Sequence, residues 1–349
     1  MFRAEELFKN ITDKNHPIET VLTIIQGKGT LPREQAGRNI HYDDASLSNY
    51  KKVEQGDYII HLRSFEGGLE MANEDGIVSP AYTILRCKKP HSSLFYEAYF
   101  HTDEFINHVL SKSVEGIRDG KQISYEAFKW LGLPYCNVSE QEKIAQLFYT
   151  LNRRIEKQQQ MVDALKKYKR GLVKLVFEQT MREAQQQLPL SELCISISSG
   201  RTTVSDTNGC FPLFGSTGVV GKTNTIEFDG DIVLVARVGA NAGMVNFYSG
   251  QCAVTDNTLV VRVKGNIIQA KFLAYFLEYY DLHRLIFGSG QPLVTGGQLK
   301  KIEMPIVSRT TQDHITERFE ALDNVIKSQE AYAQNLSRLK SGLMQQLFI

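Results

Sequence analysis

The sequence predicts an α+β chain in which two mostly β domains are each followed by one long helix. Residues 139–177 carry apolar side chains at alternating steps of four and three, which is the spacing of a heptad seam. Residues 310–348 repeat this pattern. The segments before each helix read as short strands separated by turns. We therefore expect the helices to pair as a coiled coil that carries two similar domains.

The first helical segment is long and almost uninterrupted. It contains no proline, and Gly171 is its one glycine. Roughly 39 residues at a rise of 1.5 Å give a rod of about 58 Å, longer than an ordinary globular helix. Its predicted seam consists of Ile144, Phe148, Leu151, Ile155, Val162, Leu165, Leu172 and Val176.

The second helical segment overlays the first at a constant offset of 171 (310 − 139), without a gap. Its predicted seam consists of Ile315, Phe319, Leu322, Ile326, Leu336 and Leu343. The polar interruptions recur as well, because Gln158 returns as Gln329 and Lys169 as Lys340. Unrelated amphipathic helices have no reason to share their interruptions, so this is an internal repeat.

The repeat extends upstream of the helices. Residues 131–134 align with 302–305 at the same offset, and residues 56–60 align with 230–234 at an offset of 174 (230 − 56). We predict a first globular domain over 1–138, a long helix over 139–180, a second globular domain over 188–309 and a second long helix over 310–349.

Both domains read as strands followed by a helix and a loop. In the first domain we expect strands near 21–25, 57–62 and 82–85, and a helix over 93–110. In the second domain we expect strands at 224–228, 232–235 and 258–263, and a helix over 270–286. These patterns indicate an α+β class with a predominantly β core.

Antiparallel pairing of the helices is expected, because parallel pairing would crowd both domains at one end. It would relate the domains by a pseudo-two-fold axis. Lys169 would then face Leu322 and Lys340 would face Leu151, so each ammonium would extend outward along its stem. Gln158 and Gln329 would lie near each other and fix the register of the pair.

Composition and charge exclude several classes of protein. The 349 residues carry a net charge of +1, which argues against gripping nucleic acid by bulk electrostatics alone. No apolar run approaches the roughly 18 residues of a membrane span, and the charged N-terminus is unlike a signal peptide, so we expect a cytoplasmic protein. The five cysteines are widely scattered, which favours structural thiols over zinc or disulfides.

Motifs for catalysis are missing. Residues 215–223 resemble a phosphate-binding loop but place five residues between Gly215 and Gly221 where the motif needs four. No proline is followed by another, as the base-holding motif of an adenine methyltransferase requires, and no HExxH or nucleophile elbow occurs. We predict no catalytic residue and no metal ligand, and therefore a scaffold that recognises something.

The chain resembles the specificity subunit of type I restriction–modification systems. The resemblance covers nearly the whole chain and rests on the paired helices, on Pro134 and Pro305 before them, and on residues 198–202, 288–292 and 298–302. One departure is that Glu6–Phe8 aligns with Glu192–Cys194 almost at the start, so an N-terminal extension common in the family is expected to be absent.

The resemblance implies a non-catalytic DNA-recognition subunit. Each recognition domain would read one half of a bipartite, asymmetric target in double-stranded DNA, and the helices would dock two methyltransferase (modification) subunits. S-adenosylmethionine chemistry would belong to those partners, and ATP and Mg to the restriction subunits and the full complex. Half-sites about one turn of DNA apart, roughly 34–36 Å, fit a rod of about 58 Å.

Two alternatives stay open. One is the specificity subunit of a two-subunit, type IIB-like restriction–modification enzyme that cuts on both sides of its site. A neighbouring gene for one fused modification–nuclease protein would favour it, and separate modification and restriction genes would favour a type I system. The other is a structural coiled-coil protein without a role in nucleic-acid binding.

Base reading requires side chains with paired donors and acceptors on exposed loops. The candidates are Arg63, Ser64, Arg118, Lys121 and Gln122 in the first domain and Arg201, Lys222, Arg237, Asn241 and Gln291 in the second. Arg63 and Arg237 correspond through the repeat. Basic residues of the first helix form a solvated face or a docking surface for modification subunits: Arg153, Arg154, Lys157, Lys166, Lys167 and Arg170.

Overall fold

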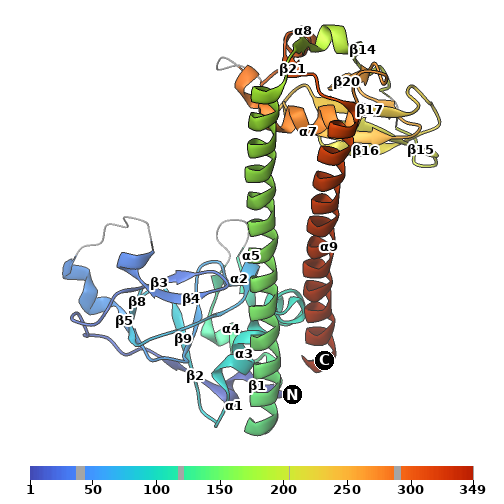
Figure 1. Cartoon of the computed structure of the whole chain (residues 1–349). Coiled ribbons are helices and arrows are strands. Elements are labelled where there is room, and N and C mark those ends of the chain that lie inside the picture. Colours follow the sequence, from blue (N-terminus) through green and yellow to red (C-terminus); the bar gives the residue numbers. More distant parts are fainter. Residues whose placement is uncertain (37–43, 117–121, 204, 287–291, 349) are drawn as a thin grey trace. The chain divides into compact units, whose positions relative to one another are not determined.

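The structure is a computed structural model that describes residues 1–36, 44–116, 122–203, 205–286 and 292–348. Contacts divide the chain into two compact units, a first unit of Met1–Gln159 with Ala331–Ile349 and a second unit of Gln160–Glu330. Each unit therefore contains one β-rich part and a section of both long helices (Figure 1). Among the described residues, no helix has the length and apolar character that crossing a membrane requires.

The two long helices are α5 (Val138–Glu183, 46 residues) and α9 (Arg309–Phe348, 40 residues). Within the first unit they run in opposite directions. The Phe148 ring stacks on Phe348 with the centroids 5.8 Å apart, and one turn and a half later Arg154 donates a hydrogen bond to the Tyr332 hydroxyl. Later residues of α5 therefore contact earlier residues of α9, as antiparallel pairing requires.

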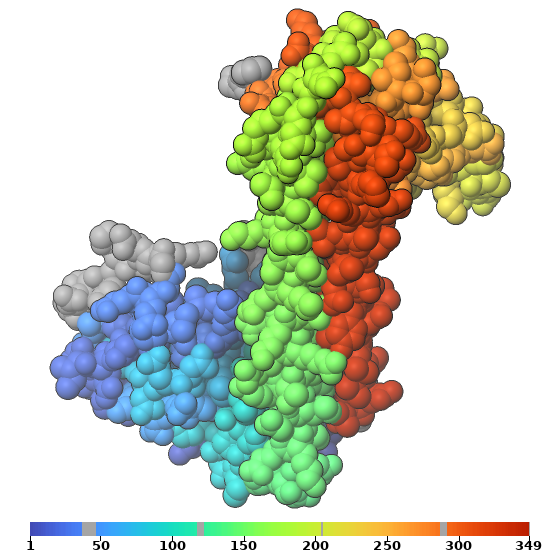
Figure 2. Space-filling view, in the orientation of Figure 1, coloured from blue at the N-terminus to red at the C-terminus, as the bar shows by residue number. Residues whose placement is uncertain are grey.

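The helix sections of the second unit pair in the same sense. Lys166 Nζ lies 2.6 Å from Glu330 Oε1, and the Phe177 ring lies 6.1 Å from the ring of Phe319. Figure 2 shows the surfaces of α5 and α9 in contact within each unit. The predicted antiparallel helix pairing is confirmed.

The predicted seam positions are buried to different degrees. Those fully buried are Phe148, Leu151, Val162, Phe319, Ile326 and Leu336. Those half-buried are Ile144, Ile155, Leu165, Leu172, Val176, Ile315, Leu322 and Leu343. The sequence analysis missed Phe177 and Phe348, two fully buried rings that are equivalent through the repeat. Both lie near helix ends, where the helix packs on its own β-rich part as well as on the other helix.

The expectation that Lys169 extends outward into solvent is wrong. Its side chain is 15% exposed, and its ammonium lies 2.7 Å from Asp323 Oδ1 and 3.1 Å from Glu278 Oε2. Asp323 follows Leu322 on α9, so the predicted register placed Lys169 correctly but missed the neighbouring carboxylate. Glu278 comes from a helix outside the pair, which no heptad pattern describes.

The β-rich part of the first unit is built around a four-stranded antiparallel sheet in the order β2-β9-β6-β7. These strands are β2 (Phe8–Ile11), β9 (Thr83–Cys87), β6 (Tyr58–Ile60) and β7 (Glu70–Met71). Smaller pairs are β3 (Leu22–Ile25) with β4 (Gly29–Pro32), β5 (Lys51–Val53) with β8 (Gly76–Val78), and β10 (Val114–Glu115) with β11 (Gln122–Ile123). The short helices are α2 (Ser64–Gly67), α4 (Tyr125–Phe128) and the 3-10 segments η1 (Arg33–Gln35), η2 (Asp44–Asn49) and η4 (Leu110–Ser113).

The second unit repeats this sheet in the order β14-β20-β17-β18. Its strands are β14 (Cys194–Ser199), β20 (Thr258–Val263), β17 (Asp231–Ala236) and β18 (Val245–Ser249). A three-stranded sheet adds β16 (Gly218–Thr223), β15 (Phe211–Gly215) and β19 (Ala253–Val254). The resemblance between residues 56–60 and 230–234 thus marks equivalent central strands, each preceded by a glycine of positive φ, Gly56 (+89°) and Gly230 (+93°).

Each β-rich part is closed by the same short elements. In the first unit β1 (Phe2–Arg3) pairs with β12 (Gly132–Leu133) just before α5, and in the second β13 (Gln187–Pro189) pairs with β21 (Glu303–Pro305) just before α9. The short helices α1 (Ala4–Leu7) and α6 (Leu190–Leu193) then lead into the first strand of each sheet. These elements explain the alignment of the two prolines and of Glu6–Phe8 with Glu192–Cys194.

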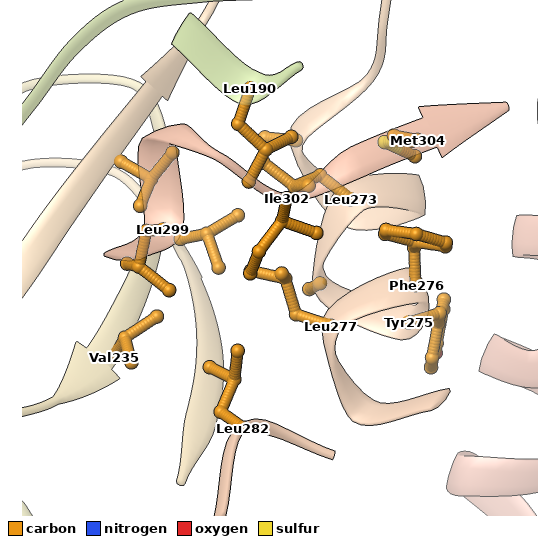
Figure 3. Packing of buried hydrophobic residues seen from close by; sticks show 14 of the residues in the cluster. Leu190, Val235, Leu273, Tyr275, Phe276, Leu277, Leu282, Leu299, Ile302 and Met304 are labelled. Carbon is orange, nitrogen blue, oxygen red and sulfur yellow. The ribbon is translucent and has the colours of Figure 1, made fainter. Parts of the chain in front are cut away.

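One helix in each unit joins the sheet to the long helices. These are α3 (Ser93–Phe100) and α7 (Ala270–Tyr280). In the first unit, Phe95 and Tyr99 place their rings 5.3 and 5.2 Å from the ring of Phe348. In the second unit, α7 lies beside the sheet (Figure 1), and Phe272 lies 5.4 Å from Phe177. Figure 3 shows this core. Side chains of α7, namely Leu273, Phe276 and Leu277, pack among side chains of other elements: Leu190, Val235, Leu282, Leu299, Ile302 and Met304.

The two helices predicted over 93–110 and 270–286 are each interrupted. The first breaks after Phe100, where the Thr102 hydroxyl donates to Tyr99 O and accepts from Phe105 N, and the π-helical segment η3 (Glu104–Val109) follows. The second breaks at Asp281, which has a left-handed φ of +57° and precedes the 3-10 segment η6 (Leu282–Leu285). Side chains that bond nearby backbone compete with helical hydrogen bonds, and the periodicity does not reveal them.

The strand predicted over 224–228 is wrong. This segment is irregular, and Phe228 makes an isolated bridge to Cys252. The Glu227 carboxylate accepts hydrogen bonds from Arg201 N in the loop after β14 and from Val254 N on β19, so a side chain, and not a strand ladder, ties this segment to its neighbours. The neighbouring glycine-rich stretch 215–223 forms the β15–β16 hairpin, and no helix follows it to hold phosphate.

Candidate nucleic-acid interface

Three loops of the second unit meet at one edge of the β14-β20-β17 sheet. Gly200 N donates to Thr258 O at 3.2 Å, Arg237 N donates to Asn257 O at 2.9 Å, and Val294 N donates to Arg237 O at 2.8 Å. Antiparallel order brings the ends of β14 and β17 to the start of β20, which explains the meeting. The loops that carry Arg201, Arg237 and Asn241 are therefore neighbours.

Glu227 fixes the loop that carries Arg201. Its Oε1 accepts from Arg201 N at 3.0 Å, and its Oε2 accepts from the Thr202 hydroxyl at 3.1 Å and from Val254 N at 3.3 Å. The backbone of Arg201 is thus held while its side chain is exposed. An exposed arginine on a fixed loop can present its donors to a base edge or a phosphate.

The loop between β17 and β18 is a tight turn that uses two glycines. Gly239 and Gly243 take positive φ values of +79° and +90°, and Ala242 N donates to Gly239 O at 3.0 Å. Arg237 and Asn241 on this loop are half-buried. In the described part of the chain, the Arg237 guanidinium forms no hydrogen bond or ion pair, so its donors are available to a ligand.

Of the other two candidates of the second unit, only Lys222 lies among the described residues, and it is not at this edge. Lys222 is exposed on β16, opposite Pro212, in the separate three-stranded sheet. Gln291 lies outside the described residues. The structure therefore brings together three of the five residues predicted for this unit, and the assignment of all five to DNA stays a prediction.

In the first unit, Arg63 occupies the place that corresponds to Arg237. It follows the central strand β6, is exposed, and precedes α2. Ser64 is buried, and its hydroxyl accepts from His61 N at 2.9 Å, so this side chain stabilises the turn. Gln122 is exposed on β11, opposite Glu115. Arg118 and Lys121 lie outside the described residues, and the DNA role of this set also stays a prediction.

A buried carboxylate beneath the Arg63 turn was missed in the sequence. Glu70 is fully buried and accepts from Gly27 N at 2.7 Å, from Gly29 N at 2.9 Å and from His101, whose Nε2 lies 3.2 Å from Oε1. His61, whose Nδ1 accepts from Arg63 N at 3.3 Å, lies in the same region. The cluster joins the β3–β4 hairpin to the end of α3, next to the turn that presents Arg63.

Opposing effects set the protonation of this cluster. Burial acts to raise the pKa of Glu70, but the hydrogen bonds from His101 and from the glycine amides outweigh it and hold the pKa below its ordinary value. Burial acts to lower the pKa of His101, but the bond to Glu70 outweighs it and raises that pKa. Each member of the pair therefore stabilises the charged form of the other. No spacing rule joins these residues, because they lie in different elements 31 positions apart.

Comparison with known proteins identifies relatives of one kind. Residues 192–337 match the family model of the Type I restriction modification DNA specificity domain. The EcoprrI type I restriction enzyme specificity subunit of Escherichia coli is 28% identical over 135 residues, which are 38% of this chain and 32% of that protein. A putative type I specificity subunit N-terminus of Mycoplasma pneumoniae is 27% identical over 134 residues, 36% of this chain and 71% of that protein. The matched stretch thus spans about a third of the Escherichia coli relative.

Solved structures share the fold over almost the whole chain. The S subunit of a type I restriction–modification system from M. genitalium superimposes with a TM-score of 0.63 at 14% identity, covering 100% of this chain and 95% of that one. The HsdS subunit of Thermoanaerobacter tengcongensis gives a TM-score of 0.53 at 15% identity, covering 99% and 95%. At these identities the likeness establishes the fold, and it confirms the predicted class of two β-rich parts on a pair of long helices.

Proposed function

We propose that the chain is a specificity subunit of a type I restriction–modification system, which reads a bipartite, asymmetric DNA target and performs no catalysis itself; the match of residues 192–337 to the DNA specificity domain of such systems supports this. The observation that carries the proposal is the repeated reader. Two sheets with the same strand order each present an arginine, Arg63 or Arg237, just after the equivalent central strand. Two similar readers in one chain match two half-sites in one target.

The two readers differ in the residues that they present, which is what an asymmetric target requires. In the second unit Arg201, Arg237 and Asn241 lie on adjoining loops. Arginine can bond guanine and asparagine can bond adenine, so this edge could read either base. In the first unit Arg63 stands beside Glu66 on the short helix α2. Each set would read its own half-site, and the paired helices would set the spacing between the halves.

The helices also supply surface for partners. Lys157, Lys167 and Arg170 of α5 are exposed, whereas Arg154 and Lys166 are engaged by α9. We infer that the exposed cations help to dock two methyltransferase subunits. S-adenosylmethionine would be bound by those subunits, and ATP and Mg by restriction subunits of the full complex.

Single-molecule sequencing of modified adenines tests the proposal. DNA from cells that express the neighbouring modification gene is sequenced with this chain present and absent. We expect one bipartite motif, with an unspecified gap, to be methylated when the chain is present and to lose modification without it. Identical modification patterns in both cells would refute the assignment.

A further inference from the structure

The repeat places Lys169 and Lys340 at equivalent positions but gives them different neighbours. In the second unit Lys169 is neutralised within the chain by Asp323 and Glu278. The Tyr275 hydroxyl donates to the other Asp323 oxygen at 2.8 Å, which fixes that carboxylate. At this position, the fold therefore surrounds a lysine with carboxylates.

The first unit lacks both carboxylates. The offset of 171 that relates the long helices maps Asp323 onto Asn152. Helices α7 and α3 are related by an offset of 177 (269 − 92), because Gln269 N and Ser92 N donate to the equivalent side chains of Gln312 and Gln141 at 2.9 and 3.0 Å. By that offset Glu278 maps onto His101.

His101 has no capacity left for a ligand. Its Nδ1 lies 2.8 Å from Glu97 O, and its Nε2 is bonded to Glu70. It therefore acts as a closed part of the buried cluster, and it offers Lys340 no counter-charge.

Lys340 is left with a half-buried ammonium. In the described part of the chain it forms no hydrogen bond or ion pair, and burial lowers the pKa of its ammonium. It lines a pocket of about 460 Å³, whose wall also contains Asn152, Phe148, Met344 and Glu97. Among the described residues, Glu97 forms no ion pair with Lys340, although both line this pocket.

The rim of the pocket points to a protein as the occupant. Leu94 is 39% exposed and Tyr149 is 47% exposed, and both line the pocket. A free small carboxylate would leave this apolar rim in water. An acidic side chain on an otherwise apolar protein surface would cover the rim and bring its carboxylate to Lys340.

We propose that this pocket docks an aspartate or glutamate of a modification subunit, whose carboxylate takes at Lys340 the role that Asp323 and Glu278 take at Lys169. The inference rests on the proposed function. It also makes the two docking sites unequal, because the second unit already supplies its own carboxylates. One of two identical modification subunits would then bind through a charge pair that the other cannot form.

The experiment measures assembly of the full chain with the modification subunit encoded beside it. Native mass spectrometry gives the number of subunits bound, and titration calorimetry gives their dissociation constants. We expect Lys340→Gln to weaken one of the two binding steps by roughly 10- to 100-fold and to leave the other unchanged. Lys327→Gln, which changes an exposed lysine of the same helix, is the matched control and should leave both steps unchanged.

A second variant guards against misfolding. Asn152→Asp restores the carboxylate that the second unit has, so it should weaken the same step by roughly three- to tenfold while the melting temperature is retained or raised. Wild-type affinity at both steps in Lys340→Gln would overturn the docking inference alone. If the unaltered chain binds no modification subunit, the proposed function fails with it. Millimolar acetate or free glutamate could weaken binding of the modification subunit to the unaltered chain while Lys340→Gln has no effect on that binding. That result would also contradict the proposed docking at this pocket.

Discussion

The two equivalent lysines of the repeat, Lys169 and Lys340, should respond differently to the same substitution. Methionine keeps the length of the lysine stem and removes the charge. In Lys169→Met, Asp323 and Glu278 are left without their cation, so the second unit should lose stability. In Lys340→Met, a half-buried ammonium without a partner is replaced by an apolar group, so the first unit should lose none.

The size of the loss follows from the exposure of the three groups. Fully exposed ion pairs contribute about 0.2–1 kcal/mol, and removal of one partner from a fully buried pair costs about 3–5 kcal/mol. The Lys169 side chain is 15% exposed, but Glu278 and Asp323 are 40% and 32% exposed, so water screens them. We expect Lys169→Met to cost about 2 kcal/mol, or about 4–8 °C in the melting temperature for a unit of this size.

The loss of stability in Lys169→Met should depend on pH through the ionisation of Glu278 and Lys169. Burial raises the pKa of Glu278 above its ordinary 4.5, and Lys169 counters this, so without the lysine the pKa rises further. The deficit of the variant is therefore full at neutral pH. It shrinks as the pH falls through the raised pKa, because a protonated carboxyl needs no cation. It also shrinks at strongly alkaline pH, where Lys169 itself loses its proton.

Urea unfolding of the unaltered chain, Lys169→Met and Lys340→Met at pH 7 and pH 4.5 tests this reasoning. Hydrogen exchange of α7 and α3 assigns each change to its unit. The result that would refute it is an equal loss in Lys169→Met and Lys340→Met, or a loss in Lys169→Met that is the same at both pH values. Either would mean that the charge cluster contributes nothing beyond the packing of the lysine stem.

Two further predictions concern the first unit. Phe348→Ala removes a fully buried ring that contacts Phe95, Tyr99 and Phe148, and should cost about 3–4 kcal/mol in urea unfolding. The exposed neighbour Leu347→Ala is its control, and equal losses in the two variants would contradict the packing. His101→Gln should cost about 1–2 kcal/mol at pH 6 and clearly less at pH 9. The raised pKa of His101 means that its stabilisation is full below about 6.5 and is lost as the pH rises through the folded value; a deficit that grows with pH would refute this.

The sequence predicted the helix pair because its periodicity is long and its polar interruptions recur. Gln158 and Gln329, or Lys169 and Lys340, identify a duplication that apolar spacing alone would leave open. Antiparallel pairing followed from the need to separate two domains on one pair. Central strands were predicted close to β17 and β20 because their apolar runs are bounded by turn residues.

The polar contacts could not be predicted in the same way. Glu70 bonds the turn residues Gly27 and Gly29 and the helix-end residue His101, and Lys169 bonds Glu278 of another helix. These partners come together only when several elements pack, and no local pattern records that. The same is true of Glu227, which lies in the segment predicted as a strand and instead accepts hydrogen bonds from Arg201 N and Val254 N through its side chain.

The central claim is that the chain contains two independent readers of one target. Arg63→Ala and Arg237→Ala, each expressed with the modification subunits, are compared by single-molecule sequencing of modified adenines. We expect each variant to relax or change the bases at one half-site and to leave the other half-site as in the unaltered chain, with the two variants affecting opposite halves. The same full motif in both variants, or loss of specificity at both halves from either substitution, would contradict the account.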